Sequence, residues 1–265
     1  MTTLAADIRE MLSEQRQYRD ILYQMTRRDL LLRYKQTVMG VGWAIFMPLV
    51  NTVIFSVIFT RVAPIDVQVP YPLFAFCGLT VWNFFASALR SSMTSLTSNA
   101  SLVTKIYFPR EMLPFSSIVV AFVDFLIGFA VIVGMMAWYR VPVGPAVLWL
   151  PVVVAVQIVF TAGVGLVLAM ANLFYRDVKY LSEVLLTAWM FASSVLYPIE
   201  LLGGRMGRAF RLNPMTTIID SYRAVLFRGE APPAQLVAAA VLGLCTLMVA
   251  WIVFHRAEQV FAERI

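Results

Sequence analysis

Charge is the first property that this chain lacks. Only 14% of its 265 residues are charged, whereas 60% are hydrophobic. Soluble domains carry charge on roughly a quarter of their residues, so this deficit argues against a soluble fold. The net charge is +6, but the basic residues collect in loops and in an N-terminal leader instead of forming one stripe. Such a distribution suits anionic lipid headgroups, and we expect no nucleic-acid partner.

Reactive side chains are also scarce. The chain has one histidine, His255, and two cysteines, Cys77 and Cys245, which lie inside apolar runs. We therefore expect no metal site and no catalytic nucleophile with a histidine partner. The phosphate-binding pattern G-x-x-x-x-G-K-[ST] does not occur in the sequence. We expect no enzyme and no cofactor in this chain, so a separate subunit would have to bind any ATP and magnesium.

What the chain does contain is a series of long apolar runs. A bilayer core about 30 Å thick is crossed by roughly 20 helical residues. The runs predict an all-α membrane protein with six transmembrane helices, and the fifth of these runs is short for a full crossing. The predicted spans are residues 38–60, 71–92, 112–138, 147–172, 182–198 and 234–254.

The leader, residues 1–36, has apolar side chains at three- and four-residue steps. This spacing predicts an amphipathic helix at the membrane interface, with packing on a partner protein as the alternative. The membrane domain then covers residues 37–265. If the N-terminus is inside, 14 of the 21 Lys and Arg residues lie on inside segments, as the positive-inside rule requires. Both termini are then cytoplasmic.

The outer connection between spans five and six, residues 199–233, is unusually apolar for a loop and carries five Arg residues. It predicts re-entrant periplasmic helices that dip back into the membrane. The inner loop that contains residues 99–111 predicts a short helix, which Ser98 or Asn99 caps and which runs through Lys105. Its apolar and aromatic surface indicates a protein contact, with packing on the leader helix as the alternative.

Asp124 is the one carboxylate deep inside a predicted span. An ionisable residue at that depth is a functional candidate by default. Two interpretations stay open: an acid or base of an intramembrane enzyme, or a buried carboxylate hydrogen-bonded to Asn51, Asn83 or Gln157. Aromatic residues are abundant in spans one, two and five, and most of them suit packing or lipid contact. Some could line a path for a sugar, and the candidates are Phe46, Trp82, Phe85, Trp189 and Tyr197.

Five segments, in order along the chain, carry a resemblance to a known family. They are RYKQTVMGVGW (33–43), FPREMLP (108–114), NLFYRDV (172–178), LYPIE (196–200) and LNPMTTIIDSYRAVLF (212–227). The chain resembles the membrane subunit of ABC-2-type polysaccharide exporters, the O-antigen and teichoic-acid permeases. The resemblance implies the ABC-2 (type V exporter) fold in the bacterial inner membrane, with a homodimer of permeases and two cytosolic ABC ATPase subunits.

The substrate that the resemblance implies is a lipid-linked polysaccharide of the undecaprenyl-pyrophosphate type, with O-antigen foremost. Capsular polysaccharide, teichoic acid and small-molecule efflux are the alternatives. The resemblance makes residues 99–111 a coupling helix on the ATPase and residues 199–227 the periplasmic gate helices. It places Arg33, Tyr34, Lys35 and Trp43 at a lateral gate, where Arg33 and Lys35 suit a pyrophosphate or serve as topological charge. The coupling residues that it implies are Asn99, Lys105, Phe108, Pro109, Arg110, Glu111, Arg176 and Asp177.

Overall fold

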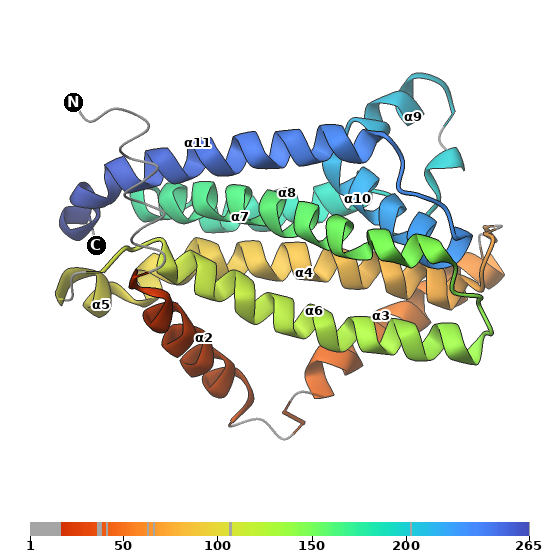
Figure 1. Cartoon of the computed structure of the whole chain (residues 1–265), viewed down its shortest axis with the longest axis horizontal. Coiled ribbons are helices and arrows are strands. Elements are labelled where there is room, and N and C mark those ends of the chain that lie inside the picture. The colour runs from red at the N-terminus through yellow and green to blue at the C-terminus, as the bar shows by residue number, and fades with distance from the viewer. Residues whose placement is uncertain are drawn as a thin grey trace.

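Long helices lie side by side along the longest axis of an elongated bundle (Figure 1). The computed structural model describes residues 17–35, 39–40, 42–62, 64–65, 67–105, 108–201 and 203–264. Within them the elements are helices: α2 (Arg19–Tyr34), α3 (Gly42–Val57), η1 (Ile58–Val62), α4 (Tyr71–Ser98), α5 (Ala100–Lys105), α6 (Met112–Trp138), η2 (Pro145–Trp149), α7 (Leu150–Phe174), α8 (Val178–Phe191), η3 (Ile199–Leu201), α9 (Gly204–Arg211), α10 (Pro214–Arg223), η4 (Ala224–Arg228) and α11 (Gln235–Arg264).

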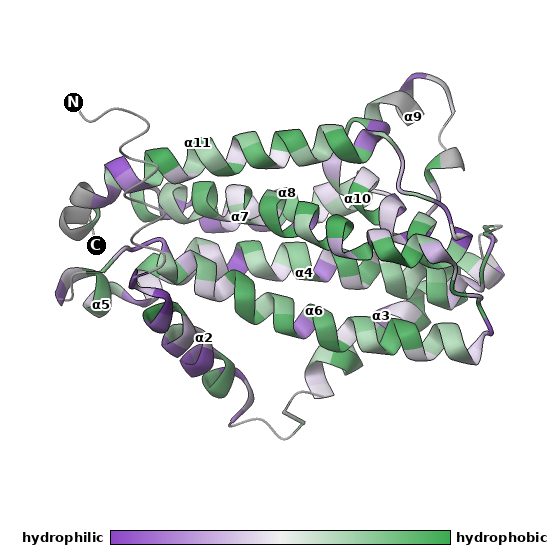
Figure 2. Ribbon diagram, in the orientation of Figure 1, coloured by the Kyte–Doolittle hydropathy of each residue, from purple (hydrophilic) through white to green (hydrophobic). Residues whose placement is uncertain are grey.

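Five helical segments in the described part of the chain are long and apolar enough to cross a membrane. They are Gly42–Arg61, Tyr71–Ser98, Met112–Trp138, Pro145–Phe174 and Gln235–Glu258. Apolar residues dominate the long helices, whereas hydrophilic residues gather on α2 and at the ends of the bundle (Figure 2). These segments coincide closely with the first, second, third, fourth and sixth predicted spans.

The fifth predicted span differs from the structure. The sequence predicts a helix over residues 182–198, but α8 ends at Phe191, and turns follow it. At 1.5 Å per residue its 14 residues extend about 21 Å, short of a bilayer core. Long-range polar contacts stabilise the turns: the Asn213 side chain donates to the Ala192 carbonyl, and Arg223 donates to the carbonyls of Ser194 and Val195. These contacts replace the intrahelical bonds that would continue α8.

Helix α4 lies at the centre of the bundle. In the apolar stretch of α4, 83% of the residues are buried, compared with 6% in the apolar stretch that contains α3. It packs against α6 and α7, and α7 packs against α11. Gly163 of α7 permits close approach to α11, because a Cβ atom there would lie 2.7 Å from the Leu247 nitrogen. Small residues at such contacts are typical of helix pairs in membranes.

The connection between α8 and α11 is mostly helical, and the described residues of 199–227 form η3, α9, α10 and most of η4. Helix α10 begins with Pro214, and the side chain of Asn213 accepts a 3.0 Å hydrogen bond from the Met215 N–H. Proline at the first position and an Asn cap are favoured at helix N-termini. Five consecutive residues of α10, Met215 to Ile219, are buried. The apolar composition of this connection therefore reflects packing against the rest of the chain.

Candidate functional site

Asp124 lies near the middle of α6 and meets the end of α2. Its Oδ2 atom is 2.7 Å from Arg33 Nη1, and Tyr34 donates a hydrogen bond from its hydroxyl to Oδ1. The Asp124 side chain is 17% exposed and that of Arg33 is 41% exposed. A charge at the centre of a membrane helix costs about 2.5–3.5 kcal/mol on insertion scales, and these two partners offset that cost. We call Arg33, Tyr34 and Asp124 the gate latch.

The gate latch connects residues that had seemed unrelated in the sequence. One of the two interpretations of Asp124 was a carboxylate hydrogen-bonded to a neighbour such as Asn51, Asn83 or Gln157; the structure shows an engaged carboxylate, but its partners are Arg33 and Tyr34. Gln157 instead donates to the Val81 carbonyl and accepts from the Tyr222 hydroxyl. The ion pair was missed because Arg33 and Asp124 are distant in the sequence and lie on different elements. The only signal in the sequence was one deep carboxylate, together with an excess of cations in the leader.

A cavity of about 230 Å³ adjoins the gate latch. Arg33 and Trp43 border it from the α2 and α3 side, while α4 and α6 form the other wall. We call it the gate cavity, and its polar or charged lining residues are Arg33, Asn51, Thr80, Asn83, Ser87, Arg90 and Asp124. Arg90 is engaged with Glu183 of α8 at 2.9 and 3.0 Å. The arrangement is a polar, partly cationic cavity beside membrane-length helices.

The other residues predicted for the gate, Trp43 and Lys35, lie beside this cavity or on the surface, as does Phe46, which was predicted for the channel. Trp43 and Phe46 are 41% and 44% exposed, and their rings meet edge to face at 5.7 Å. Lys35 is exposed just after α2. Burial, together with the hydrogen bond to Asp124, raises the pKa of Tyr34 to about 12. The phenol therefore stays protonated at neutral pH and remains a donor to the carboxylate.

Three of the five predicted channel aromatics form one packed group. Trp82 and Phe85 are 3% and 0% exposed. Trp189 meets both rings, at 6.5 and 5.2 Å between centroids, and Phe160 stacks on Phe85 at 5.6 Å. This geometry favours the packing interpretation for these residues within one chain. Tyr197 donates from its hydroxyl to the Phe191 carbonyl, while Phe46 remains on the surface.

The loop that holds α5 packs on its own chain over part of its surface. Val103 and Phe108 are buried in a cluster that also contains Met25 of α2 and Phe254 of α11. Arg28 donates to the Asn99 side chain at 2.9 Å, which joins α2 to the start of α5. Ile106 and Tyr107, expected on the same surface, lie outside the described residues. The packing alternative is therefore confirmed for Val103 and Phe108.

A contact surface is nevertheless available beside these buried residues. Ser101, Thr104 and Lys105 of α5 are exposed, as are Arg176 and Asp177 at the turn between α7 and α8. Pro109 is buried. The exposed residues offer polar and charged groups at the same end of the bundle as the C-terminal part of α11 (Figure 1). The sequence predicted this end to be cytoplasmic.

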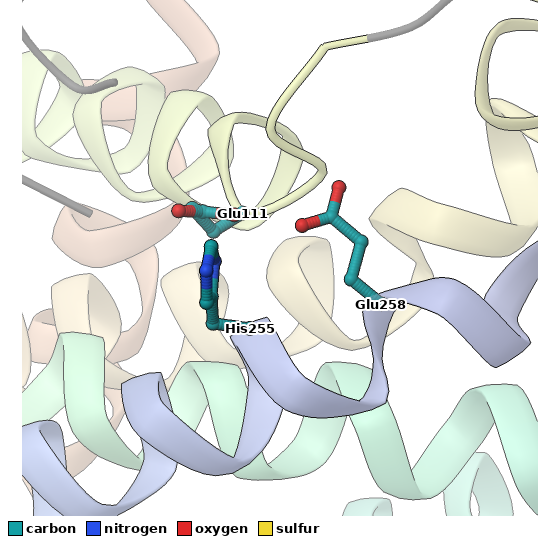
Figure 3. A group of neighbouring side chains, drawn as sticks. All are labelled: Glu111, His255 and Glu258. Atoms are coloured by element: carbon teal, nitrogen blue, oxygen red, sulfur yellow. The ribbon is translucent and has the colours of Figure 1, made fainter. Parts of the chain in front are cut away.

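Arg110 and Glu111 belong to a buried cluster that the sequence did not reveal. Glu111 is 0% exposed and accepts from Trp251 Nε1 at 3.2 Å. Figure 3 shows its carboxylate close to the His255 ring, with Glu258 one turn further along α11. Two carboxylates and one imidazole could hold a divalent cation, and their ligand atoms lie within 4.8 Å of one another. However, the Arg110 N–H donates to Glu258 at 2.8 Å, which favours a polar tie between the α5 loop and α11.

Arg223 was counted only as an outer-loop cation, but the structure buries it. It is 3% exposed and donates to the carbonyls of Ser194 (2.5 Å), Val195 (2.7 Å) and Phe74 (3.2 Å). Its guanidinium also lies 3.5 Å from the centroid of the Phe74 ring. Burial lowers its pKa to about 10, so the side chain stays charged at neutral pH. No local pattern around residue 223 indicated these partners.

The described helices define a multi-pass, all-helical membrane protein. A model of the family of ABC-2 type transporters matches residues 21–227, and the chain therefore belongs to that family. The matched range contains the gate latch, α5 and α10, and this agrees with the resemblance stated above.

Curated relatives match nearly the whole chain. The O-antigen export system permease protein RfbA of Myxococcus xanthus is 31% identical over 253 residues, with 94% of this chain and 96% of the relative covered. Two proteins of the same name from Klebsiella pneumoniae are 29% and 28% identical, with 92% of this chain and 94% of each relative covered.

Proposed function

We propose that this chain is the permease subunit of an ATP-driven exporter that carries a lipid-linked O-antigen polysaccharide across the bacterial inner membrane. The observation that carries the proposal is the similarity to O-antigen export permeases over more than nine-tenths of both chains. Similarity that extends from end to end involves the gate, the core and the periplasmic connection together. It therefore supports the whole transport function and not one shared helix pair.

A separate ATPase is part of this proposal, because the sequence has no phosphate-binding loop of its own. The exposed face of α5, with Lys105, and the α7–α8 turn, with Arg176 and Asp177, form the proposed contact surface. Arg110 and Glu111 act from behind that surface, since they tie the α5 loop to α11. Force applied at α5 would then reach the last long helix through buried polar contacts.

We also infer that α8 and the turns after it cross the membrane, as the fifth of six passages in chain order. Two copies of the chain would then form the translocation path. Leu181, Val184 and Leu185 of α8 are 59%, 68% and 55% exposed. An apolar face of this kind suits lipid or a second copy, and not water. With α8 crossing and α9 and α10 on the periplasmic side, both termini are cytoplasmic.

The proposed path for the substrate begins at the gate cavity. Arg33 and Arg90 line it and supply positive charge, and Lys35 is exposed just after α2. Phosphate accepts charge-assisted hydrogen bonds from such groups. Trp43 and Phe46 lie on the exposed side of α3, where an acyl or isoprenoid chain would remain in lipid. The pairing of Asp124 with Arg33 gives the intramembrane-enzyme hypothesis little support, because the carboxylate is already engaged as a counter-ion.

A genetic complementation experiment tests the proposed function. In a strain that lacks the chain, surface O-antigen should disappear while lipid-linked glycan accumulates inside, and the full-length chain should restore export. Purification in mild detergent should bring down an ABC ATPase in equal amount. Normal surface glycan in the deletion strain would contradict the proposal. If the deletion strain kept its surface glycan and lost the efflux of a small molecule, the result would favour the small-molecule efflux branch of the family.

A further inference from the structure

Asp124, a carboxylate on a helix long enough to cross the membrane, holds the end of α2, which is not one of the membrane-length helices. Both oxygens of Asp124 are used: Oδ2 faces Arg33 Nη1 at 2.7 Å, and Oδ1 accepts from the Tyr34 hydroxyl. Arg33 and Tyr34 are the last two residues of α2. In its middle part α2 is held by apolar packing around Met25 and by the hydrogen bond from Arg28 to Asn99. The position of the α2 C-terminus therefore depends on Asp124.

The same carboxylate is paired with Arg33, the cation that an anionic substrate would need. Among the described residues that line the gate cavity, Asp124 is the one carboxylate and Arg33 and Arg90 are the cations. Arg90 is already held by Glu183 across to α8. Arg33 is thus the lining cation whose partner lies inside the cavity, and a phosphate that enters the cavity must compete with Asp124 for it.

We propose that Asp124 is a positioning residue for the gate: it keeps Arg33 and Tyr34 against α6 until the phosphate of a lipid-linked substrate takes Arg33 over and frees the end of α2. This inference rests on the proposed function for its ligand, and on the geometry of the gate latch for its mechanism. Phosphate accepts two hydrogen bonds from a guanidinium and carries more charge than a carboxylate. The weak screening beside an apolar bundle strengthens both pairings, so the exchange is a competition between two strong contacts.

After the exchange the Asp124 carboxylate has lost its counter-ion, but hydrogen-bond donors remain in the site. The Asn83 amide and the Ser87 hydroxyl also line the same cavity and can donate to it. The ion pair therefore restrains α2 without making its release prohibitive, which is what a reversible latch requires.

Distance measurements in the full-length protein test the latch directly. Spin labels at Leu32→Cys and Leu126→Cys, both on exposed positions of α2 and α6, report their separation. The exposed Cys245 is replaced by Ser, while the native Cys77 is buried. Dilution with unlabelled protein limits the signal to distances within one chain. Asp124→Asn should broaden the distribution and lengthen its mean, whereas the control Asp220→Asn, which removes a paired carboxylate on α10, should leave it as in the wild type.

Inorganic pyrophosphate separates the proposed role from a merely structural ion pair. Added to the wild-type protein, it should broaden the distance distribution, because it competes with Asp124 for Arg33, whereas a structural pair would not respond. Arg33→Asp combined with Asp124→Arg should restore the narrow distribution, because the two charges still attract each other. It should also restore part of the export, because a phosphate that captures the cation on α6 still releases the end of α2. Surface glycan in the deletion strain should fall several-fold with Asp124→Asn and recover in part with the exchange.

Each result decides one point. An unchanged distance distribution in Asp124→Asn overturns the latch, and a distribution that stays narrow in the wild-type protein with pyrophosphate overturns the competition with phosphate. If Asp124→Asn does not accumulate, Tyr34→Phe and Arg33→Gln probe the latch from the α2 side, with a broader distribution expected for Arg33→Gln. If even the wild-type chain fails to restore surface glycan, the proposed function fails, while the distance data still accept or reject the latch.

Discussion

Buried charge is where single residues matter most in this protein. Arg223 is 3% exposed and donates to three main-chain carbonyls, two of which, those of Ser194 and Val195, lie in the turns after α8. Removing one partner from a buried polar network is costly because the remaining groups lose their hydrogen bonds while staying out of water. Asp124 follows the same logic, with the difference that its partners lie on α2, whose release we propose above.

The first prediction concerns Arg223. Arg223→Met keeps most of the side-chain volume but leaves the carbonyls of Ser194 and Val195 without their donor. We expect a loss of about 3–5 kcal/mol in stability, the range for breaking a buried charged contact, measured by thermal or denaturant unfolding of purified protein. Arg228→Met is the matched control, because that partly exposed residue pairs with Asp220 and Glu230 and should cost less than about 1 kcal/mol. Equal losses in the two variants would contradict the prediction.

A second prediction at this scale concerns Gly78. A Cβ atom there would lie 2.3 Å from the Val195 carbonyl oxygen and 2.6 Å from Arg223 Nη2. Gly78→Ala should therefore displace the Arg223 contacts and lower stability by about 1–3 kcal/mol, as overpacking does. Gly134→Ala is the control on α6, because nothing lies within 4 Å of its added methyl group. Unfolding temperatures of the two variants provide the comparison, and a stable Gly78→Ala protein would count against the packing described.

At the scale of elements, the sequence is informative wherever the period and the length of an apolar run decide the outcome. The bounds of α6, Met112–Trp138, match the predicted third span residue for residue. Prediction fails where a distant side chain decides the ending, as it does for α8 and the Asn213 and Arg223 contacts. The gate latch is a similar case, since Tyr34 and Asp124 are 90 residues apart. Residue types could indicate that Asp124 needs a partner, but only the packing of α2 on α6 identifies it.

The third prediction separates the two faces of α5. Lys105 is exposed, so Lys105→Glu should leave the amount and unfolding temperature of the protein unchanged while reducing co-purification of the ATPase several-fold. Arg61→Glu, at an exposed position on the other side of the predicted membrane, is the control and should retain the ATPase. Val103 is 1% exposed, so Val103→Asp should instead destabilise the protein itself. Full ATPase recovery with Lys105→Glu would remove α5 from the proposed contact.

The whole molecule combines a rigid centre with a less enclosed side. Helices α4 and α7 are mostly buried, whereas few residues of α3 are buried. In lipid, an exposed apolar helix is stable but gains little from burial against its own chain. Its position then depends on the surrounding lipid and on its link to α2. Because the ion pair of the gate latch holds the end of α2, the proposed release of that pair would affect the whole outer side of the bundle.

The last prediction concerns how often the chain crosses the membrane. If α8 and the turns after it cross, Asp177 and Leu212 lie on opposite sides. In a Cys245→Ser background, Leu212→Cys should react with an impermeant maleimide added to spheroplasts, whereas Asp177→Cys should react only after the membrane is opened. Both positions are exposed in the structure, so their difference in labelling reports topology and not burial. Labelling of both from the same side would mean that α8 does not cross, which would put the C-terminus opposite to the predicted cytoplasmic side.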